Sequence, residues 1–306
     1  MSTFPKNARV IFTGCSITAH CNYTLRILNH YRKKLPDLNV KFFAACQAGG
    51  SLVNAITHFD DMILPFEPTH ATVMYGGNDC TLGVLNRPDG EDKTNKLSEA
   101  AENYKRNLDT FIEMLLKHNI NPTFVTQTCY GEFMSIDTPI YKGGHARTAE
   151  FAEYMRKACI KYGIDYADIH ARMSELYTHE ELLIGDRVHP TDFGHYRMAE
   201  EFLRHQGLDI GEYVPHGELL SDSWNAEWFK NAYRFSRIWG AYVNLPWLKL
   251  YEKPYEEQMD IINEYVLTRG YSNDPAARDF STEFSIFKPI QHTFVENLRR
   301  LNGDNI

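Results

Sequence analysis

The sequence predicts an α/β protein with a parallel sheet, followed by a helical segment. Short apolar runs alternate with longer helical patterns over about residues 8–206, and several of these runs end at glycine-containing loops. Strands that alternate with helices in this way form parallel sheets with right-handed crossovers. The alternation ends near residue 206, so we divide the chain into a main domain, residues 1–206, and an extension, residues 207–306.

The expected elements follow one another along the main domain. Apolar, strand-forming runs predict the strands, helical spacing of apolar residues predicts the helices, and the pair Gly49-Gly50 marks a tight turn before the second helix. The strands are expected over 8–13, 39–45, 70–75, 122–126 and 164–169, and the helices over 21–34, 52–64, 97–118 and 147–162. The helix over 97–118 should bury one face, formed by Ala101, Tyr104, Leu108, Phe111, Ile112 and Leu115.

The extension is expected to be helical and rich in aromatic residues. Apolar residues recur at helical spacing from Trp224 to Tyr242, and further helices are expected over 255–267 and 289–301. An apolar stripe of this size most simply packs against the main domain or a partner subunit, so a homodimer through these helices is one hypothesis. The alternative is a lid or a sugar-stacking wall formed by the tryptophans, which all lie between residues 224 and 247.

Composition and charge exclude several classes of protein. The net charge of −8 has no compensating basic face, which argues against a nucleic-acid partner. No apolar stretch approaches the roughly 18 residues that span a bilayer. The first residues lack the apolar segment and cleavage site of a signal peptide, so a cytoplasmic location is expected. The six cysteines form no CxxC pair and are expected to be reduced.

Polar groups that follow the predicted strands indicate one functional site. Ser16, Gly50 and Asn78 come after the first, second and third strands, and the carboxyl ends of parallel strands meet at one edge of the sheet. Further along the chain, Asp186 and His189 lie three residues apart, a spacing that suits a compact turn. We therefore expect all five residues to converge.

These residue types suit nucleophilic catalysis by serine. A serine hydroxyl is barely ionised at neutral pH, so Ser16 needs His189 as a base and Asp186 as the acceptor of the other ring N–H. The attacked carbonyl becomes an oxyanion that needs hydrogen-bond donors. The expected donors are the backbone N–H groups of Ser16 and Gly50 and the side-chain amide of Asn78.

Other motifs do not indicate a metal or a cofactor. His189 and His195 lack a third ligand at a sensible spacing, and we expect His195 at the surface or at a helix cap. The pair Gly76-Gly77 lacks the lysine of a phosphate-binding loop. Two loops, over 80–95 and 128–145, are long enough to shape a pocket, although a disordered connection is equally open for the first.

The same motifs resemble those of the SGNH (GDSL-type) hydrolase family. Its four sequence blocks are similar, in order, to Gly14-Cys15-Ser16, Gly49-Gly50, Gly76-Gly77-Asn78-Asp79 and Asp186-Arg187-Val188-His189. The resemblance covers about residues 8–206. It implies a flavodoxin-like three-layer α/β/α sandwich with a five-stranded parallel sheet of order 2-1-3-4-5. It also implies ester hydrolysis with the site residues named above.

The chain departs from the family pattern at two positions. Cys15 stands where the family usually carries aspartate, and Ala45 stands where it usually carries asparagine. The missing aspartate raises the question of how the nucleophile loop is held. Cys15 itself is expected to be a small packed residue, with a rival nucleophile as the alternative.

We interpret the chain as a serine esterase that forms an acyl-enzyme intermediate without a metal. The first choice of substrate is an O-acetyl ester on a carbohydrate-like molecule. A lipase, lysophospholipase or thioesterase of the same family is the alternative among enzymes. A catalytically degenerate protein that binds a glycan or a partner is the alternative from another class.

Overall fold

The computed structural model describes residues 2–135, 140–243 and 288–306. Within these residues, one parallel sheet contains five strands in the order β2-β1-β3-β4-β5. The strands are β1 (Arg9–Gly14), β2 (Lys41–Cys46), β3 (His70–Met74), β4 (Asn121–Val125) and β5 (Asp165–Ala167). The predicted fold class and the strand order that the family resemblance implied are confirmed.

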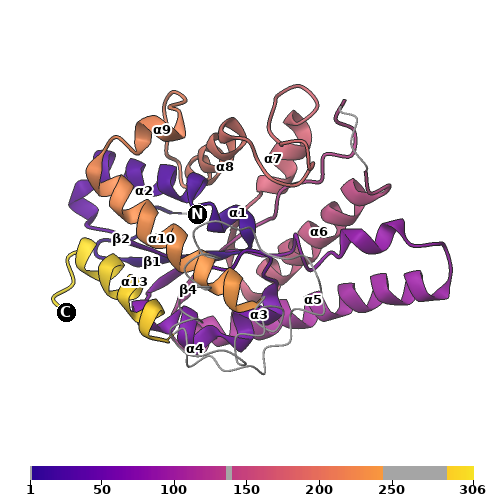
Figure 1. Ribbon diagram of the computed structural model, residues 1–306, viewed down its shortest axis with the longest axis horizontal. Coiled ribbons are helices and arrows are strands. Elements are labelled where there is room, and N and C mark those ends of the chain that lie inside the picture. The colour runs from indigo at the N-terminus through magenta and orange to yellow at the C-terminus, as the bar shows by residue number, and fades with distance from the viewer. Residues whose placement is uncertain (1, 136–139, 244–287) are drawn as a thin grey trace, which may run out of the picture.

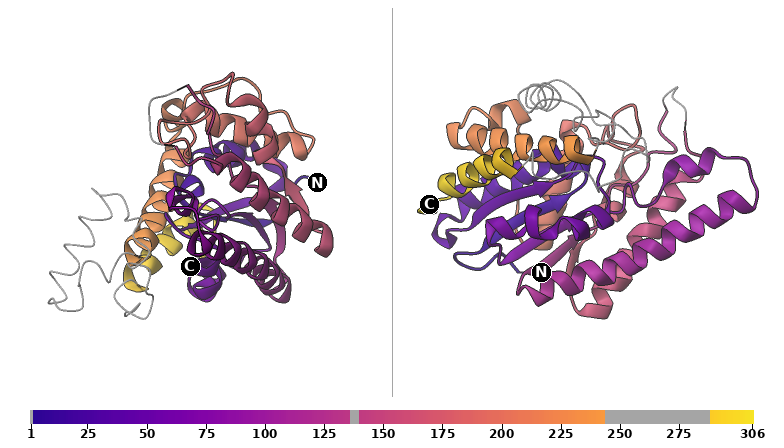
Figure 2. Two further views of the ribbon diagram at one scale, coloured as in Figure 1. Left: turned by 90° about the vertical axis from the view of Figure 1, so that its right-hand side faces the viewer. Right: turned by 60° about the horizontal axis from the view of Figure 1, so that its bottom comes forward.

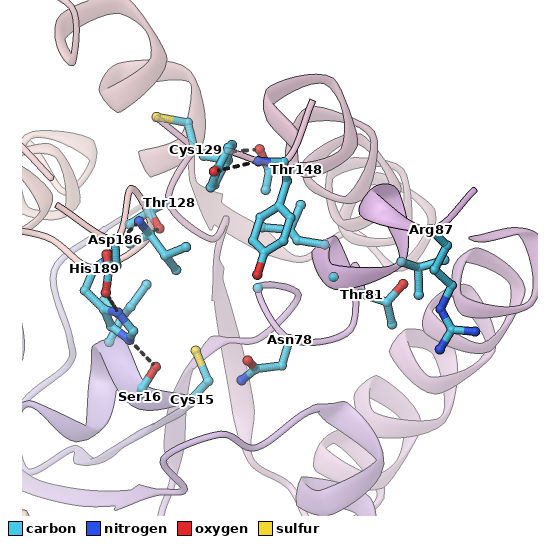
Figure 3. A pocket seen from close by; sticks show the side chains of 18 residues that line it. Cys15, Ser16, Asn78, Thr81, Arg87, Thr128, Cys129, Thr148, Asp186 and His189 are labelled. Carbon is cyan, nitrogen blue, oxygen red and sulfur yellow. Dashed lines mark hydrogen bonds and ion pairs between the residues drawn. The ribbon is translucent and has the colours of Figure 1, made fainter. Parts of the chain in front are cut away.

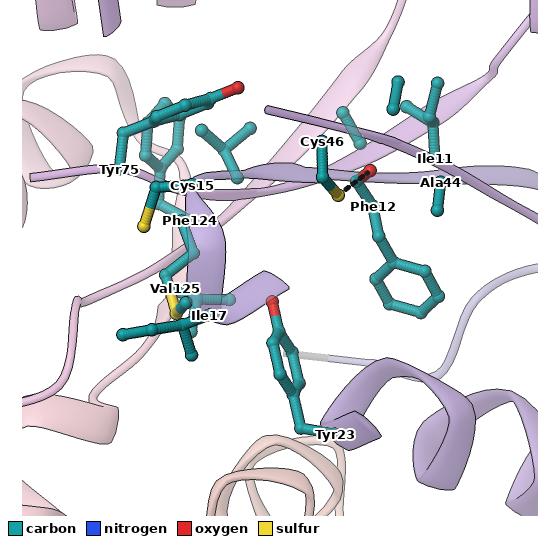
Figure 4. Packing of buried hydrophobic residues seen from close by; sticks show 14 of the residues in the cluster. Ile11, Phe12, Cys15, Ile17, Tyr23, Ala44, Cys46, Tyr75, Phe124 and Val125 are labelled. Atoms are coloured by element: carbon teal, nitrogen blue, oxygen red, sulfur yellow. Dashed lines mark hydrogen bonds between the residues drawn. The ribbon is translucent and has the colours of Figure 1, made fainter. Parts of the chain in front are cut away.

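The central strand shows why the sequence forms this sheet. β1 lies between β2 and β3, with Phe12 opposite Ala44 on one side and Thr72 on the other. Both faces of a parallel sheet are covered, so its strands are apolar along their length rather than alternating. Figure 4 shows Phe12 and Cys46 in this interior, where the Cys46 Sγ donates to the Phe12 carbonyl oxygen at 3.4 Å.

Helices cover both faces of the sheet (Figure 1). In the main domain they are α1 (Ser16–Ala19), α2 (Asn22–Lys34), α3 (Leu52–Thr57), α4 (Phe59–Met62), α5 (Glu91–Lys117), α6 (Gly144–Tyr162), α7 (Ile169–Leu176) and α8 (Asp192–His205). Short 3₁₀ segments occur at η1 (Pro36–Leu38), η2 (Leu64–Phe66) and η3 (Leu82–Asn86). α2 packs against α8 on one face, and α5 packs against α3 and α6 on the other. These layers leave the carboxyl ends of the strands free to carry a site.

Most predicted elements differ from the observed ones by one or more residues at their ends, and three of these differences are informative. The helix expected over 52–64 is divided into α3 and α4, because the backbone leaves the helical conformation at His58. α5 begins at Glu91 and its first turns extend beyond the sheet (Figure 2), whereas the face predicted to be buried is buried. β5 ends at Ala167, because the Asp168 carboxylate caps α7 by accepting from the Ala171 N–H at 3.2 Å.

The described part of the extension packs along the edge of the sheet. It contains α9 (His216–Leu219), α10 (Ser223–Val243) and α13 (Lys288–Leu301), and α10 packs against both β2 and α13. α10 and α13 lie side by side (Figure 1). Trp228 Nε1 donates to the Phe42 carbonyl oxygen at 2.8 Å, and the Phe42 N–H donates to Asn302 Oδ1 at 2.9 Å. The backbone groups that an edge strand leaves unpaired are thus covered at this residue.

The packing of α10 distinguishes, for two of the tryptophans, between a contact with the main domain and a lid or sugar-stacking wall. Trp228 and Trp239 are buried in the same apolar cluster as β1 and β2, so they do not form a lid or a sugar-stacking wall. Trp247 and the helix expected over 255–267 lie outside the described residues. The domain boundary at residue 206 and the homodimer stay predictions. No helix among the described residues is long and apolar enough to cross a membrane.

Candidate active site

The nucleophile candidate lies at the carboxyl end of β1. Gly14 ends the strand, and a Cβ atom at this position would lie 2.3 Å from Thr18 Oγ1 and 2.7 Å from the Met74 carbonyl oxygen. Only glycine therefore lets α1 turn so closely back on the sheet. Ser16 is the first residue of α1, so its N–H has no acceptor within the helix. This N–H is thus available to a substrate.

Ser16, His189 and Asp186 are joined by hydrogen bonds (Figure 3). Ser16 Oγ lies 2.8 Å from His189 Nε2, and His189 Nδ1 lies 2.6 Å from Asp186 Oδ2. The other carboxylate oxygen, Asp186 Oδ1, accepts from the backbone N–H groups of Val188 and His189, each at 2.9 Å. With a proton on Nδ1, the ring accepts at Nε2 from the Ser16 hydroxyl.

The environment of Asp186 keeps it ionised. Burial raises the pKa of Asp186, but the hydrogen bond from the His189 ring and those from two backbone N–H groups outweigh burial and place the pKa below its ordinary value. The turn that carries this carboxylate has Arg187 in the left-handed region, with φ of 67°. The buried Arg187 guanidinium donates to the Gly131 carbonyl oxygen at 2.8 Å, which ties the turn to the loop over 128–145.

The loops after β2 and β3 meet beside the serine. Asn78 Nδ2 donates to the Gly50 carbonyl oxygen at 2.7 Å. The Gly50 N–H, expected to be a free donor, instead donates to the Gln47 carbonyl oxygen at 2.9 Å. This bond closes a turn in which Gly49 has φ of 76°, so the tight turn that the glycine pair predicts also engages the expected donor. The role predicted for Gly50 therefore needs this N–H to be shared or released.

Asp79 has a positioning role that the sequence did not assign. Its carboxylate accepts from the Leu52 N–H at 3.0 Å and from the Gly76 N–H at 3.1 Å. It therefore connects the start of α3, next to the Gly50 turn, to the loop that carries Asn78. The only signal in the sequence was its place in the Gly76-Gly77-Asn78-Asp79 motif.

A cavity of about 560 Å³ opens at these residues (Figure 3). The loop over 80–95 contributes Thr81, Leu82, Gly83, Val84 and Arg87 to its lining, and the loop over 128–145 contributes Thr128, Cys129, Tyr130 and Tyr141. The prediction that these two loops shape a pocket is confirmed. The first loop is not a featureless connection, because it forms η3.

Cys15 also lines the cavity but is packed beneath the nucleophile loop. It is 3% exposed, and burial raises the pKa of its thiol. A thiolate is the reactive form of cysteine, so this environment disfavours attack by Cys15. The expectation of a small packed residue is confirmed. All six cysteines are buried and free.

The expectation for His195 is wrong. His195 is 3% exposed, and its ring stacks on Tyr23 with centroids 6.3 Å apart and 7° between the planes. It lies in α8, on the side that packs against α2, and burial lowers its pKa well below the ordinary value. Within residues 2–135, 140–243 and 288–306, no group of three or more histidine, cysteine or acidic side chains is arranged to hold a metal ion.

Several solved structures share this fold. They include an acetylxylan esterase from Geobacillus stearothermophilus (16% identity, 69% of this chain and 99% of that chain, TM-score 0.56) and an alpha/beta hydrolase from the metagenome of Lake Arreo, Spain (17% identity, 68% and 99%, TM-score 0.56). A gut microbial diltiazem-metabolizing enzyme is similar over 99% of this chain and 96% of its own (14% identity, TM-score 0.66). At these identities the likeness concerns the fold alone.

Sequence comparison identifies the family. Among curated proteins, none matches this sequence. The family model described as GDSL-like lipase/acylhydrolase matches residues 12–197, more than half of the chain, and these residues span the loops of Ser16, Asn78 and His189. The protein belongs to the GDSL-like lipase/acylhydrolase family.

Proposed function

We propose that this protein is a serine esterase that hydrolyses carboxylic esters through an acyl-enzyme intermediate. The observation that carries the proposal is the hydrogen-bonded series Asp186, His189 and Ser16, with distances of 2.6 and 2.8 Å, at the wall of a cavity of about 560 Å³. Membership of a family of lipases and acylhydrolases supports the same class of reaction.

The first half of the reaction acylates Ser16. Its hydroxyl oxygen attacks the ester carbonyl carbon while His189 Nε2 takes the hydroxyl proton. Asp186 holds the ring by its Nδ1–H and stabilises the imidazolium. The tetrahedral intermediate then collapses, the bond to the alcohol oxygen breaks, and His189 returns its proton to the leaving alcohol.

We assign two donors to the oxyanion. One is the Ser16 N–H, which has no acceptor within α1. The other is the Asn78 amide, whose nitrogen carries two hydrogens and uses one of them for the Gly50 carbonyl oxygen. The Gly50 N–H joins them only if its bond to Gln47 is shared or released.

In the second half of the reaction, water attacks the acyl group with His189 again as base.

We further propose an O-acetyl ester on a carbohydrate-like alcohol as the substrate. Hydroxyl side chains of Thr81, Thr128 and Thr148 line the cavity, together with Tyr130 and Tyr141. The tyrosine rings offer an aromatic surface that suits a sugar, whereas the hydroxyls of Thr128 and Thr148 are already bonded to the carbonyl oxygens of Val188 and His145. The similarity of the fold to an acetylxylan esterase points in the same direction.

The decisive experiment compares hydrolysis of p-nitrophenyl acetate by the wild type, Ser16→Ala and Cys15→Ala. We expect activity to be lost in Ser16→Ala and kept in Cys15→Ala. Activity that does not depend on Ser16 would remove the esterase mechanism. Loss of activity in Cys15→Ala, with Ser16→Ala still active, would identify the thiol as the nucleophile instead.

A substrate panel then tests the acyl and alcohol groups. It contains acetylated xylo-oligosaccharides, acetylated monosaccharides, diltiazem, a thioester and p-nitrophenyl esters of increasing chain length. We expect acetyl esters of sugars to have the highest kcat/KM. Faster hydrolysis of long-chain esters would favour a lipase or lysophospholipase, and preference for the thioester would favour a thioesterase. Glycan binding without any turnover would favour the non-catalytic alternative.

A further inference from the structure

The imidazole of His189 has a third contact besides its two hydrogen bonds. The ring of His20 lies against it, with centroids 5.6 Å apart and 17° between the planes. Aromatic rings stack in an offset arrangement at centroid distances of roughly 4.5–7 Å, and this pair falls within that range. Ser16 and Asp186 therefore hold the two ring nitrogens, while His20 covers one face of the ring.

The position of His20 is set by α1, the helix that begins at the proposed nucleophile, Ser16. His20 directly follows α1, and its N–H donates to the Ser16 carbonyl oxygen at 3.0 Å. The same turn of backbone thus carries the nucleophile and the ring that lies against its base. A shift of His20 would also move Ser16.

His20 is supported from behind by a residue of α8. The ring of His195 lies 6.2 Å from that of His20 with 47° between the planes, and His195 in turn stacks on Tyr23. His195 is buried, so it resists displacement. His20 therefore lies between His189 and His195, and the rings form a continuous series into the interior. No hydrogen bond is needed for this contact, which is why sequence motifs do not reveal it.

The ring of His20 carries no charge at neutral pH. Although His20 is an exposed residue, the protein atoms around its ring and the neighbouring His189 lower the pKa of His20 to about 4. Arg237 of α10 also lowers this pKa, whereas Asp186 raises it. A neutral aromatic ring attracts a cation at its face, whereas a second imidazolium would repel it. The imidazolium that forms when His189 takes the serine proton thus meets a neutral neighbour.

We infer that His20 is a positioning residue for the reaction, which keeps the His189 imidazole aimed at Ser16 by stacking against its face. The inference rests on the proposed serine mechanism. It concerns the shape and neutrality of the His20 ring rather than any proton transfer by His20. A phenyl ring should therefore replace it, and a side chain without a ring should not.

The test uses His20→Phe, His20→Ala and His20→Gln, with His205→Ala as a control at an exposed site. For Ala and Gln we expect kcat on p-nitrophenyl acetate to fall about 10- to 100-fold with little change in KM, because a small misplacement of the base slows the chemical step. His20→Phe should stay within about threefold of the wild type and keep its pH profile above about pH 5. Thermal unfolding of each variant is measured first. If His20→Ala does not fold, His20→Gln is compared with the wild type instead.

Two results would overturn the inference. Wild-type kcat in the folded Ala or Gln variant would show that the stack does not position the base. A loss in His20→Phe as large as that in Ala would show that the imidazole acts chemically instead. Failure of the serine mechanism is recognised separately, because Ser16→Ala would then remain active whatever the His20 variants do.

Discussion

The side-chain amide of Asn78 donates a hydrogen bond to the carbonyl oxygen of Gly50 at 2.7 Å. This bond joins the loops that follow β2 and β3, from which two of the oxyanion donors were predicted. The bond fixes the orientation of the Asn78 side-chain amide. One of the two hydrogens on Nδ2 is used for the Gly50 carbonyl oxygen, and the other is left for a substrate. The same contact explains how a side chain from one strand end is held beside a serine from another.

Replacing Asn78 should slow the chemical step. For Asn78→Ala we expect kcat to fall about 10²- to 10³-fold, the usual effect of losing one oxyanion donor, with a small change in KM. Asn78→Asp has the same size but carries a negative charge, so it should be at least as slow. Steady-state kinetics on p-nitrophenyl acetate measure both. An Asn78→Ala enzyme with normal kcat would mean that Asn78 only holds the loop.

The carboxylate of Asp186 should be needed for the correct tautomer of His189. In Asp186→Asn the amide can donate to Nδ1, which moves the ring proton to Nε2 and removes the acceptor for the serine hydroxyl. We expect kcat to fall about 10³- to 10⁴-fold. Asp37→Asn, at an exposed position of η1 that does not line the cavity, is the control and should keep full activity. If Asp186→Asn retained most of the activity, orientation by Asp186 would not be required.

Thiol reagents should spare the enzyme. Burial raises the pKa of Cys15, and the other cysteines are also buried, so iodoacetamide should react slowly near neutral pH. We expect activity to persist during a treatment that inactivates a control enzyme with an exposed catalytic cysteine. Mass spectrometry of the intact protein measures the extent of alkylation. Rapid inactivation with one label on Cys15 would contradict the packed position of this thiol.

The end of the chain should contribute stability that depends on pH. Asp304 accepts from Arg9 at 2.8 Å, from Lys41 at 2.7 Å and from Arg299 at 2.9 Å. Although burial raises the pKa of Asp304, these partners lower it well below the ordinary value. Since the folded pKa is the lower one, the stabilisation is fully present above the unfolded value of about 3.9 and is lost as pH falls through the folded value.

Asp304→Asn should therefore destabilise the protein at pH 7 by about 1–3 kcal/mol, because it leaves three partly buried cations without their carboxylate. The difference from the wild type should shrink as the pH is lowered below about 4. Urea unfolding at several pH values measures it, and Asp209→Asn serves as a surface control. A difference that does not change with pH would exclude the ionic explanation.

The extension should be needed for folding of the main domain. Trp228 is fully buried against the edge strand, so Trp228→Ala should destabilise by about 3–5 kcal/mol. Deleting residues 207–306 removes α10 and α13 together and exposes apolar surface along β2. We expect the truncated chain to aggregate. Gel filtration and light scattering of the full chain report the oligomeric state, and a truncated chain that stays dimeric and soluble would exclude dimerisation through these helices.

The local pattern of residues was sufficient to predict much of the fold. The apolar spacing on α5 identified its buried face residue by residue, because that face follows from the helical repeat alone. The glycine-containing loops after β1, β2 and β3 identified the edge of the sheet where Ser16, Gly50 and Asn78 meet. The positions at which helices start or break were less predictable. Asp168 ends β5 by capping α7, and His58 divides a helix that periodicity alone would have continued.

Sequence by itself determined the residue types, their order and the sheet that gathers them. The tertiary structure decided which of their atoms are free to act. It engaged the Gly50 N–H in its own turn, placed Asp79 between two loops, buried Cys15 and His195, and stacked His20 on His189. The physical reason is that strand and helix patterns depend on neighbours along the chain. Hydrogen-bond partners, burial and ring contacts depend on groups brought together by packing from distant parts of the chain.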